Sequence, residues 1–194
     1  MTVDPLYLFV FAGLLSPGPN VVLLTASGAR FGFRRTLPHV AGVALGVGVI
    51  AAVAGLGAGA VLLAAPGLAL ALRIAAAGWI LWMAFRLATA AARPRNAAVD
   101  RPFTLLQAVL FQWINPKVWA VAFAAAAGYA AGLGPAGEAL RLALAFSGIN
   151  LVVCLFWSWA GAILTYLLTT PRAWSGFMYV MAAALAASAV MVFL

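Results

Sequence analysis

The stretch LLSPGPNVVLLTASGARFGFRR, residues 14–35, starts inside the first apolar run of the chain, contains two prolines and a glycine, and then turns basic. Proline has no backbone N–H and disrupts the turn before it, and glycine lets the backbone bend. The segment SPGPN, residues 16–20, therefore predicts a break in the first helix. The half-helix that restarts at Asn20 has unpaired N–H groups and a positive dipole end, which together bind anions such as a carboxylate.

The composition places this break inside a membrane. Of 194 residues, 67% are hydrophobic and 7% are charged, whereas an ordinary globular domain is about half apolar and about a quarter charged. We therefore expect an all-α integral membrane protein in which residues 1–194 form a single membrane domain. Because irregular backbone at membrane depth is tolerated only where protein or a water-filled cavity covers it, we expect the break to line a polar cavity.

Six apolar runs are long enough to cross a bilayer, which takes roughly 20 apolar residues. The first run carries Asp4 and no Lys or Arg before its apolar part, so we expect it to be retained as a span and not removed as a signal peptide. The only long polar link between runs is ARPRNAAVDRP, residues 92–102. The expected spans are residues 5–27, 38–63, 67–90, 104–130, 140–168 and 174–194.

The basic residues predict the orientation, because Lys and Arg are enriched in cytoplasmic loops. With the N-terminus outside, the inner side holds eight arginines and the outer side holds only Arg73 and Arg141. We therefore predict that both termini lie outside. The net charge is +8, but the basic residues lie between apolar runs and form no dense basic face. We therefore expect no nucleic-acid partner. The eight inner arginines are Arg30, Arg34, Arg35, Arg86, Arg93, Arg95, Arg101 and Arg172.

The two halves of the chain match each other. A shift of 97 residues aligns GPNVVLL, residues 18–24, with NPKVWAV, residues 115–121. A shift of 98 residues aligns GWILWMAFRLA, residues 78–88, with GFMYVMAAALA, residues 176–186. Three spans per repeat bring the second repeat into the membrane from the opposite face. We therefore expect six transmembrane helices as two inverted three-helix repeats, about 5–90 and 102–194, with helices one and four broken.

In transporters built from inverted repeats, broken helices at matching positions mark the binding site. Lys117 lies some 13 residues into the fourth apolar run, where a lysine costs roughly 2.5–3.5 kcal/mol on insertion scales. We expect it to face a cavity in which a substrate carboxylate neutralises it, with snorkelling to a membrane interface as the alternative. The candidate substrate-binding residues are Ser16, Pro17, Gly18, Pro19, Asn20, Gln112, Asn115, Pro116, Lys117 and Asn150.

Several of these candidates have a structural alternative. Asn20 and Asn115 either cap the restarting half-helices or contact substrate. For Asn150, an interhelical hydrogen bond is slightly favoured over a contact with a ligand. Outside the candidate set, His39 is expected at the cytoplasmic interface, with a proton relay as its alternative.

Other classes of protein fit the sequence poorly. Cys154 is the only cysteine, which excludes the paired thiols of a membrane electron carrier. One histidine and three acids leave too little for the ligand clusters of a metal exporter, and the spans offer no base and nucleophile for an enzyme. We therefore expect no metal, no cofactor and no catalytic residue. A non-transporting scaffold stays open, but it would have no need of Lys117.

Three blocks resemble the LysE/RhtB family of amino acid exporters. They are SPGPNVVLLTASGARFGFRR with the following AGVALG, then LRIAAAGWILWMAFR, then FQWINPKVWAVAFA. The resemblance implies six spans in a bacterial inner membrane, efflux of amino acids or their derivatives driven by the proton gradient, and a homodimer. By match to the family motifs, it implies these site residues: Pro17, Gly18, Pro19, Asn20, Asn115, Pro116 and Lys117.

The chain lacks the acidic residues that one part of that family carries in its spans. Exporters of lysine and arginine in the family tend to carry acids in spans two and four, where this chain reads ALGVGVIAA and NPKVWAV. A cationic side chain would find no counter-ion and would meet Lys117, so we expect a small neutral amino acid or derivative. The context is similar to the cysteine/O-acetylserine exporter branch, and homoserine/threonine exporters or another small solute also fit. Because the spans lack a buried acid, the sequence does not indicate which residues would carry protons.

Overall fold

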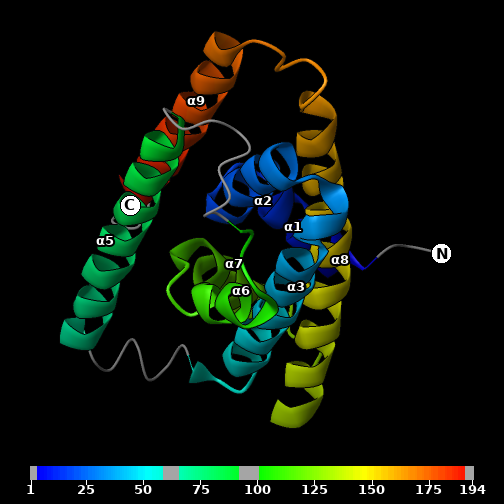
Figure 1. The fold of residues 1–194 in the computed structure, drawn as a ribbon. Coiled ribbons are helices and arrows are strands. Elements are labelled where there is room, and N and C mark those ends of the chain that lie inside the picture. The colour runs from blue at the N-terminus through cyan, green and yellow to red at the C-terminus, as the bar shows by residue number, and fades with distance from the viewer. Residues whose placement is uncertain (1–3, 59–65, 92–100, 191–194) are drawn as a thin grey trace.

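The computed structural model of the chain describes residues 4–58, 66–91 and 101–190 (Figure 1). In these residues the chain forms helices and short connections and no strand, so the expected all-α class is confirmed for this part. The helices are α1 (Pro5–Leu15), α2 (Pro19–Phe31), α3 (Phe33–Gly55), α5 (Pro66–Ala91), α6 (Leu105–Gln112), α7 (Pro116–Gly128), α8 (Pro135–Leu164) and α9 (Pro171–Val190).

Among the described residues, four helices are long and apolar enough to cross a membrane, namely α3, α5, α8 and α9. The helices α1 and α2 pass the same test as a pair bent by 59°, which makes up to five candidate spans. The remaining expected span, residues 104–130, consists of α6 with 8 residues and α7 with 13. Each of these two is shorter than the roughly 20 residues that a crossing needs.

The helix ends differ from the expected spans at several places. The helix α3 begins at Phe33 and not at 38, so Pro38 lies inside it. The carbonyl of Arg34 loses its helical donor to that proline, but Arg34 is exposed, where solvent or lipid headgroups can hydrogen-bond the carbonyl. The helix α8 begins at Pro135 and not at 140, because a proline is favoured in the first turn, where its missing N–H costs nothing. The expected residues 59–63 and 191–194, with Arg93 and Arg95, lie outside the described residues.

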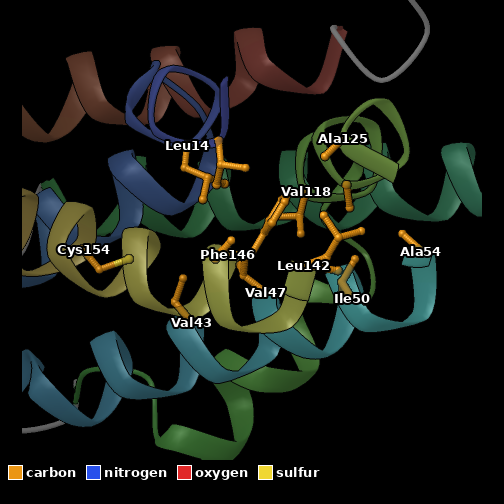
Figure 2. Close-up of a cluster of buried hydrophobic side chains, with 14 of the residues drawn as sticks. Leu14, Val43, Val47, Ile50, Ala54, Val118, Ala125, Leu142, Phe146 and Cys154 are labelled. Carbon is orange, nitrogen blue, oxygen red and sulfur yellow. The ribbon is translucent and has the colours of Figure 1, made fainter. Parts of the chain in front are cut away.

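The main core lies where α3 and α8 pack along each other, with α1 and α7 closing it (Figure 2). From α3, Val43, Val47 and Ile50 repeat at the spacing of one helix face and are fully buried. They contact a cluster that includes Leu142 and Phe146 of α8. This packing fixes the position of α7, and therefore of Lys117, against the middle of α8.

Small residues bring the helices close together at two crossings. A Cβ added at Gly46 of α3 would lie 2.7 Å from the Cγ of Gln112 in α6, and one at Gly42 would collide with the Leu105 carbonyl oxygen, so these glycines let α3 and α6 pack closely. At the second crossing, a Cβ on Gly28 of α2 or on Gly161 of α8 would collide with a carbonyl oxygen of the other helix. The helices that carry the two breaks are therefore held at backbone contact distance from α3 and α8.

The helices α5 and α9 pack against each other and form a separate layer, on the left in Figure 1. A second core cluster joins this layer to the rest of the molecule, with Ile80 and Met83 of α5 and Leu185 of α9 buried against Phe111 of α6. The layer therefore flanks the broken helices without forming part of the main core.

Charges separate toward the two ends of α8. Near its start, Arg141 donates a hydrogen bond of 2.6 Å to the Asp4 carboxylate. Just past its end, the Thr165 hydroxyl donates one of 2.7 Å to the Ala29 carbonyl, next to Arg30. Twenty-four residues of helix separate these two points, about 36 Å at the helical rise. Asp4 and Arg141 therefore lie at one end of the molecule, and Arg30 lies at the other.

Candidate functional site

A small cavity of about 10 Å³ lies between the two helix breaks. This volume is at the lower limit of what a single water molecule needs. The first turns of α2 and α7 both reach it, so two positive helix dipole ends converge on one polar space. Half of the candidate site residues line it, together with apolar neighbours. The lining residues are Leu14, Gly18, Asn20, Val21, Asn115, Lys117, Val118 and Asn150.

The Lys117 ammonium occupies the first break. It donates hydrogen bonds to the Ser16 carbonyl and, at 3.3 Å, to the Pro17 carbonyl. These carbonyls lie at the C-terminal end of α1, where no further helical turn supplies donors and where the dipole favours a cation. The sequence predicts an anion site at the N-terminal end of the restarting helix but not this cation site at the C-terminal end of α1. Because Lys117 follows Ser16 by 101 residues, no local sequence signal indicates the contact.

Gly18 makes room for this lysine. Its φ of 178° and ψ of −178° are extended backbone that any residue adopts, so the backbone conformation alone does not require glycine here. A Cβ at Gly18 would lie 2.7 Å from Lys117 Cδ and 3.1 Å from Nζ. The glycine is therefore required by the space that the lysine side chain fills.

Asn20 and Gln112 join the two broken helices through their amides. The Asn20 amide donates to Gln112 Oε1 at 2.9 Å, and the Gln112 amide donates back to Asn20 Oδ1 at 3.2 Å. Gln112 also donates to the Ala108 carbonyl at 2.9 Å and is fully buried, but it does not line the cavity. Asn20 makes no capping bond, since α2 has no side-chain cap.

Asn115 and Asn150 each present an unpartnered polar atom. Both side chains are buried, at 1% and 2% exposure. Within the described residues, Asn115 Oδ1 and Asn150 Nδ2 have no hydrogen-bond partner. Asn115 takes the N-cap position of α7 without a side-chain cap bond. Since a buried polar atom without a partner costs about 1–3 kcal/mol, one acceptor and one donor on this cavity are available to a ligand.

The second break satisfies its carbonyl differently. The Trp119 indole N–H donates to the Trp113 carbonyl at 3.0 Å. Trp113 is the C-cap of α6, so the indole performs at this break the task that Lys117 performs at the first. With seven tryptophans in the chain, the sequence carries no signal that distinguishes Trp119 from the others.

The remaining candidates shape the breaks without lining the cavity. Ser16 and Pro17 are exposed and contribute carbonyls to Lys117. Pro19 and Pro116 open α2 and α7, where a proline favours a helix start. Lys117 is the only charged residue among those described around the cavity. The arrangement can therefore accept one net negative group and hydrogen-bond a donor and an acceptor beside it.

The model of the LysE type translocator family matches residues 11–194. This chain belongs to the LysE type translocator family. Cysteine/O-acetylserine efflux proteins of Salmonella choleraesuis (strain SC-B67) and Salmonella typhimurium (strain LT2) are similar to this LysE-family chain, at 27% identity over 118 residues. The match covers 61% of this chain and 60% of each relative. No solved structure matches it. Family membership and the apolar helices make this LysE-family chain a multi-pass membrane protein.

Proposed function

We propose that this LysE-family protein is a secondary exporter that moves small neutral amino acids or their derivatives out of the bacterial cytoplasm. The observation that carries the proposal is the set of three polar groups around one cavity: the Lys117 ammonium, the free Asn115 oxygen and the free Asn150 amide. The names of the similar efflux proteins of Salmonella support an amino acid substrate.

The three groups complement the backbone part of an amino acid. A substrate carboxylate accepts from Lys117 and from the Asn150 amide, close to the positive ends of α2 and α7. The substrate ammonium donates to Asn115 Oδ1. With no carboxylate among the described lining residues, a second positive charge on the substrate has no partner there. A neutral side chain therefore fits best.

Binding requires the breaks to separate. The cavity of about 10 Å³ holds no amino acid, so a substrate enters only when the two broken helices move apart. In that state Lys117 exchanges the carbonyls of Ser16 and Pro17 for the substrate carboxylate. The rest state is stable without substrate because those carbonyls keep the ammonium hydrogen-bonded.

Movement of the two halves around this site is the proposed transport step. The halves are the inverted repeats expected from the sequence, 5–90 and 102–194, and α6 with α7 is the fourth of six spans. Helix contacts that exchange in pairs support this symmetry: α1 packs on α8 as α6 packs on α3, and α2 packs on α8 as α7 packs on α3. The proton gradient as energy source, the homodimer and the inner-membrane location follow from the family resemblance.

Efflux from loaded vesicles tests the function. Vesicles with and without the protein are loaded with a panel of labelled amino acids, and release is followed for wild type, Lys117→Ala and Asn150→Ala. We expect release of one or a few neutral amino acids, lowered about tenfold or more in both variants, because a hydrogen bond to a charged group is worth about 1.5–3 kcal/mol. Ser188→Ala is the control, since Ser188 is also buried but its hydroxyl donates only to a carbonyl of its own helix α9.

The outcomes separate the alternatives. Equal efflux from wild type and Lys117→Ala, at equal amounts of folded protein, would place the site elsewhere. Release of a solute other than an amino acid would keep the transporter and reject the substrate class. No release of any solute from folded protein would favour the non-transporting scaffold.

A further inference from the structure

A second cavity of about 770 Å³ lies between the α5–α9 layer and the helices α2, α3 and α6. It shares no lining residue with the small cavity between the breaks. Its volume falls in the range of about 300–1,000 Å³ that is typical of small-molecule sites. The proposed export site does not use it, so it requires an explanation of its own.

One end of this cavity is cationic. Arg30 of α2, Arg86 of α5 and Arg101, just before α6, all line it. The Arg86 guanidinium lies 5.2 Å from the ring centre of Trp82, which holds the charge over the cavity wall. No carboxylate is found among the described lining residues. Arginines from three segments therefore line one cavity, and Arg86 and Arg101 give it the positive charge that an anionic group needs.

The other end is apolar and opens sideways. Trp79, seven residues before Arg86, lies about 10 Å further along α5. Trp79 and Leu110 line the cavity and are still 45% and 56% exposed. Because α5 is long and apolar enough to cross a membrane, we expect its exposed side chains to face lipid. The cavity is thus a slot with a charged part and an apolar part, and we expect the apolar part to lie in the bilayer.

His39 lies at the inner wall of the slot. It is 2% exposed, its ring stacks 5.0 Å from Phe103, and it lines the cavity. Within the described residues, neither of its ring nitrogens has a hydrogen-bond partner. A buried imidazole N–H without an acceptor is costly, and a phosphate or ester oxygen in the slot would satisfy it.

We propose that this slot binds one anionic phospholipid. The phosphate of the headgroup lies between Arg86 and Arg101, His39 donates to a phosphate or ester oxygen, and an acyl chain covers the wall of Trp79 and Trp82. A small amino acid has the charge but no chain to cover about 10 Å of apolar wall. The inference stands independently of the export function, because its readout is lipid binding.

Native mass spectrometry of the purified protein in detergent tests this. Phosphatidylglycerol and phosphatidylcholine with equal acyl chains are titrated against wild type and the Arg86→Gln/Arg101→Gln variant. We expect wild type to bind phosphatidylglycerol more tightly. A membrane-surface arginine contributes about 1 kcal/mol toward an anionic lipid, so the double variant is expected to bind roughly 25-fold more weakly. Arg34→Gln/Arg35→Gln is the matched control, since both residues are exposed on α3 and neither lines the slot.

A second variant keeps the test independent of the arginines. His39→Phe keeps a flat ring against Phe103 and removes the two unpartnered nitrogens, so the lipid-free protein is expected to unfold at an equal or higher temperature. Its phosphatidylglycerol affinity is nevertheless expected to fall several-fold. A purely structural histidine would not produce this opposite pair of effects.

Three results would overturn the proposal. One is equal affinity for the two lipids. Another is an equal loss in the Arg34/Arg35 control, which would mean a general charge effect. The third is competition by free neutral amino acids or inorganic phosphate with the same dependence on Arg86 and Arg101, which would make the slot a solute cavity.

Discussion

At the first break, a lysine and two backbone carbonyls satisfy one another where an apolar span would otherwise leave all three unpaired. A second mutual pairing lies one turn later, where the amides of Asn20 and Gln112 hydrogen-bond each other across the two halves. Each partner is distant in sequence, so the breaks depend on residues of the opposite half. Among the described residues that line the small cavity, Asn115 and Asn150 keep buried polar atoms without a hydrogen-bond partner, which is why they and Lys117 define the proposed site.

Removal of both amides of the pair is expected to cost less than the sum of the two single removals. Asn20→Leu leaves the fully buried Gln112 with unpaired groups, so we expect a loss of about 1–3 kcal/mol of stability. The Asn20→Leu/Gln112→Leu variant replaces both by apolar groups of similar size and is expected to lose less than the sum of the two single changes. Unfolding in mild detergent, arranged as a double-mutant cycle, measures the coupling. Strictly additive losses would mean that the pair does not act as a unit.

Part of this site could be predicted from local sequence. Proline inside an apolar run indicates a break or a kink, so the break at SPGPN and the one at NPK could be located. Pro38, by contrast, lies inside the continuous helix α3. Which side chain fills a break depends on packing between halves about a hundred residues apart. The Lys117 contact with Ser16, the Trp119 contact with Trp113 and the unpartnered state of Asn115 therefore appear only in the structure.

Among the elements, α8 is the one on which both broken helices depend. It contacts α1, α2, α3 and α7, and it contributes Asn150 to the small cavity. Its start could be predicted only to within five residues, because the apolar pattern continues past Pro135 into a first turn that holds Glu138. The backbone contact of α2 with α8 is set by Gly28 and Gly161, which the sequence alone did not single out.

This crossing is expected to tolerate no side chain. In Gly28→Ala or Gly161→Ala, the new methyl meets a carbonyl of the facing helix, so we expect a loss of roughly 1–3 kcal/mol and a displaced α2. Gly148→Ala on the same helix α8 is the control, because nothing lies within 4 Å of its Cβ position. It is expected to be neutral or to stabilise by about 0.5–1 kcal/mol. Equal unfolding midpoints for Gly28→Ala and Gly148→Ala would contradict a tight crossing.

For the whole molecule, the segregation of charge along α8 predicts the orientation in the membrane. Cys154 is 1% exposed, so a Cys154→Ala background carries no reactive thiol. In that background, Leu133→Cys lies at the end shared by Asp4 and Arg141, and Arg34→Cys lies at the arginine-rich end. With both termini outside, an impermeant maleimide is expected to label the first variant in intact cells and the second only after permeabilisation. The reverse pattern would invert the topology.

The ion pair between Asp4 and Arg141 is expected to make the free energy of unfolding depend on pH in the acidic range. The hydrogen bond from Arg141 holds the pKa of the Asp4 carboxyl below its ordinary value of 3.8. A lowered pKa in the folded state means that the stabilisation is present above the unfolded value and is lost as the pH falls through the folded one. Asp4→Asn keeps a good N-cap and removes the charge. We expect a small difference in unfolding temperature from wild type at pH 6 that closes below about pH 4.

The control for this prediction is the same substitution without its partner. In an Arg141→Gln background, Asp4→Asn is expected to leave the unfolding temperature nearly unchanged at every pH. A difference that persists at low pH would assign the effect to the turn at the start of α1 and not to the charge.

The distance in sequence between Lys117 and the break it fills also sets an order of events during synthesis. Ser16 leaves the ribosome 101 residues ahead of Lys117, which at about 5–20 residues per second is a delay of roughly 5–20 seconds. For that interval the first broken helix enters the bilayer with its carbonyls lacking their final donor. Until the second half arrives, the nascent first half depends on water, on lipid headgroups or on the insertion machinery, and a chain that stalls there exposes an unfinished break to quality-control proteases.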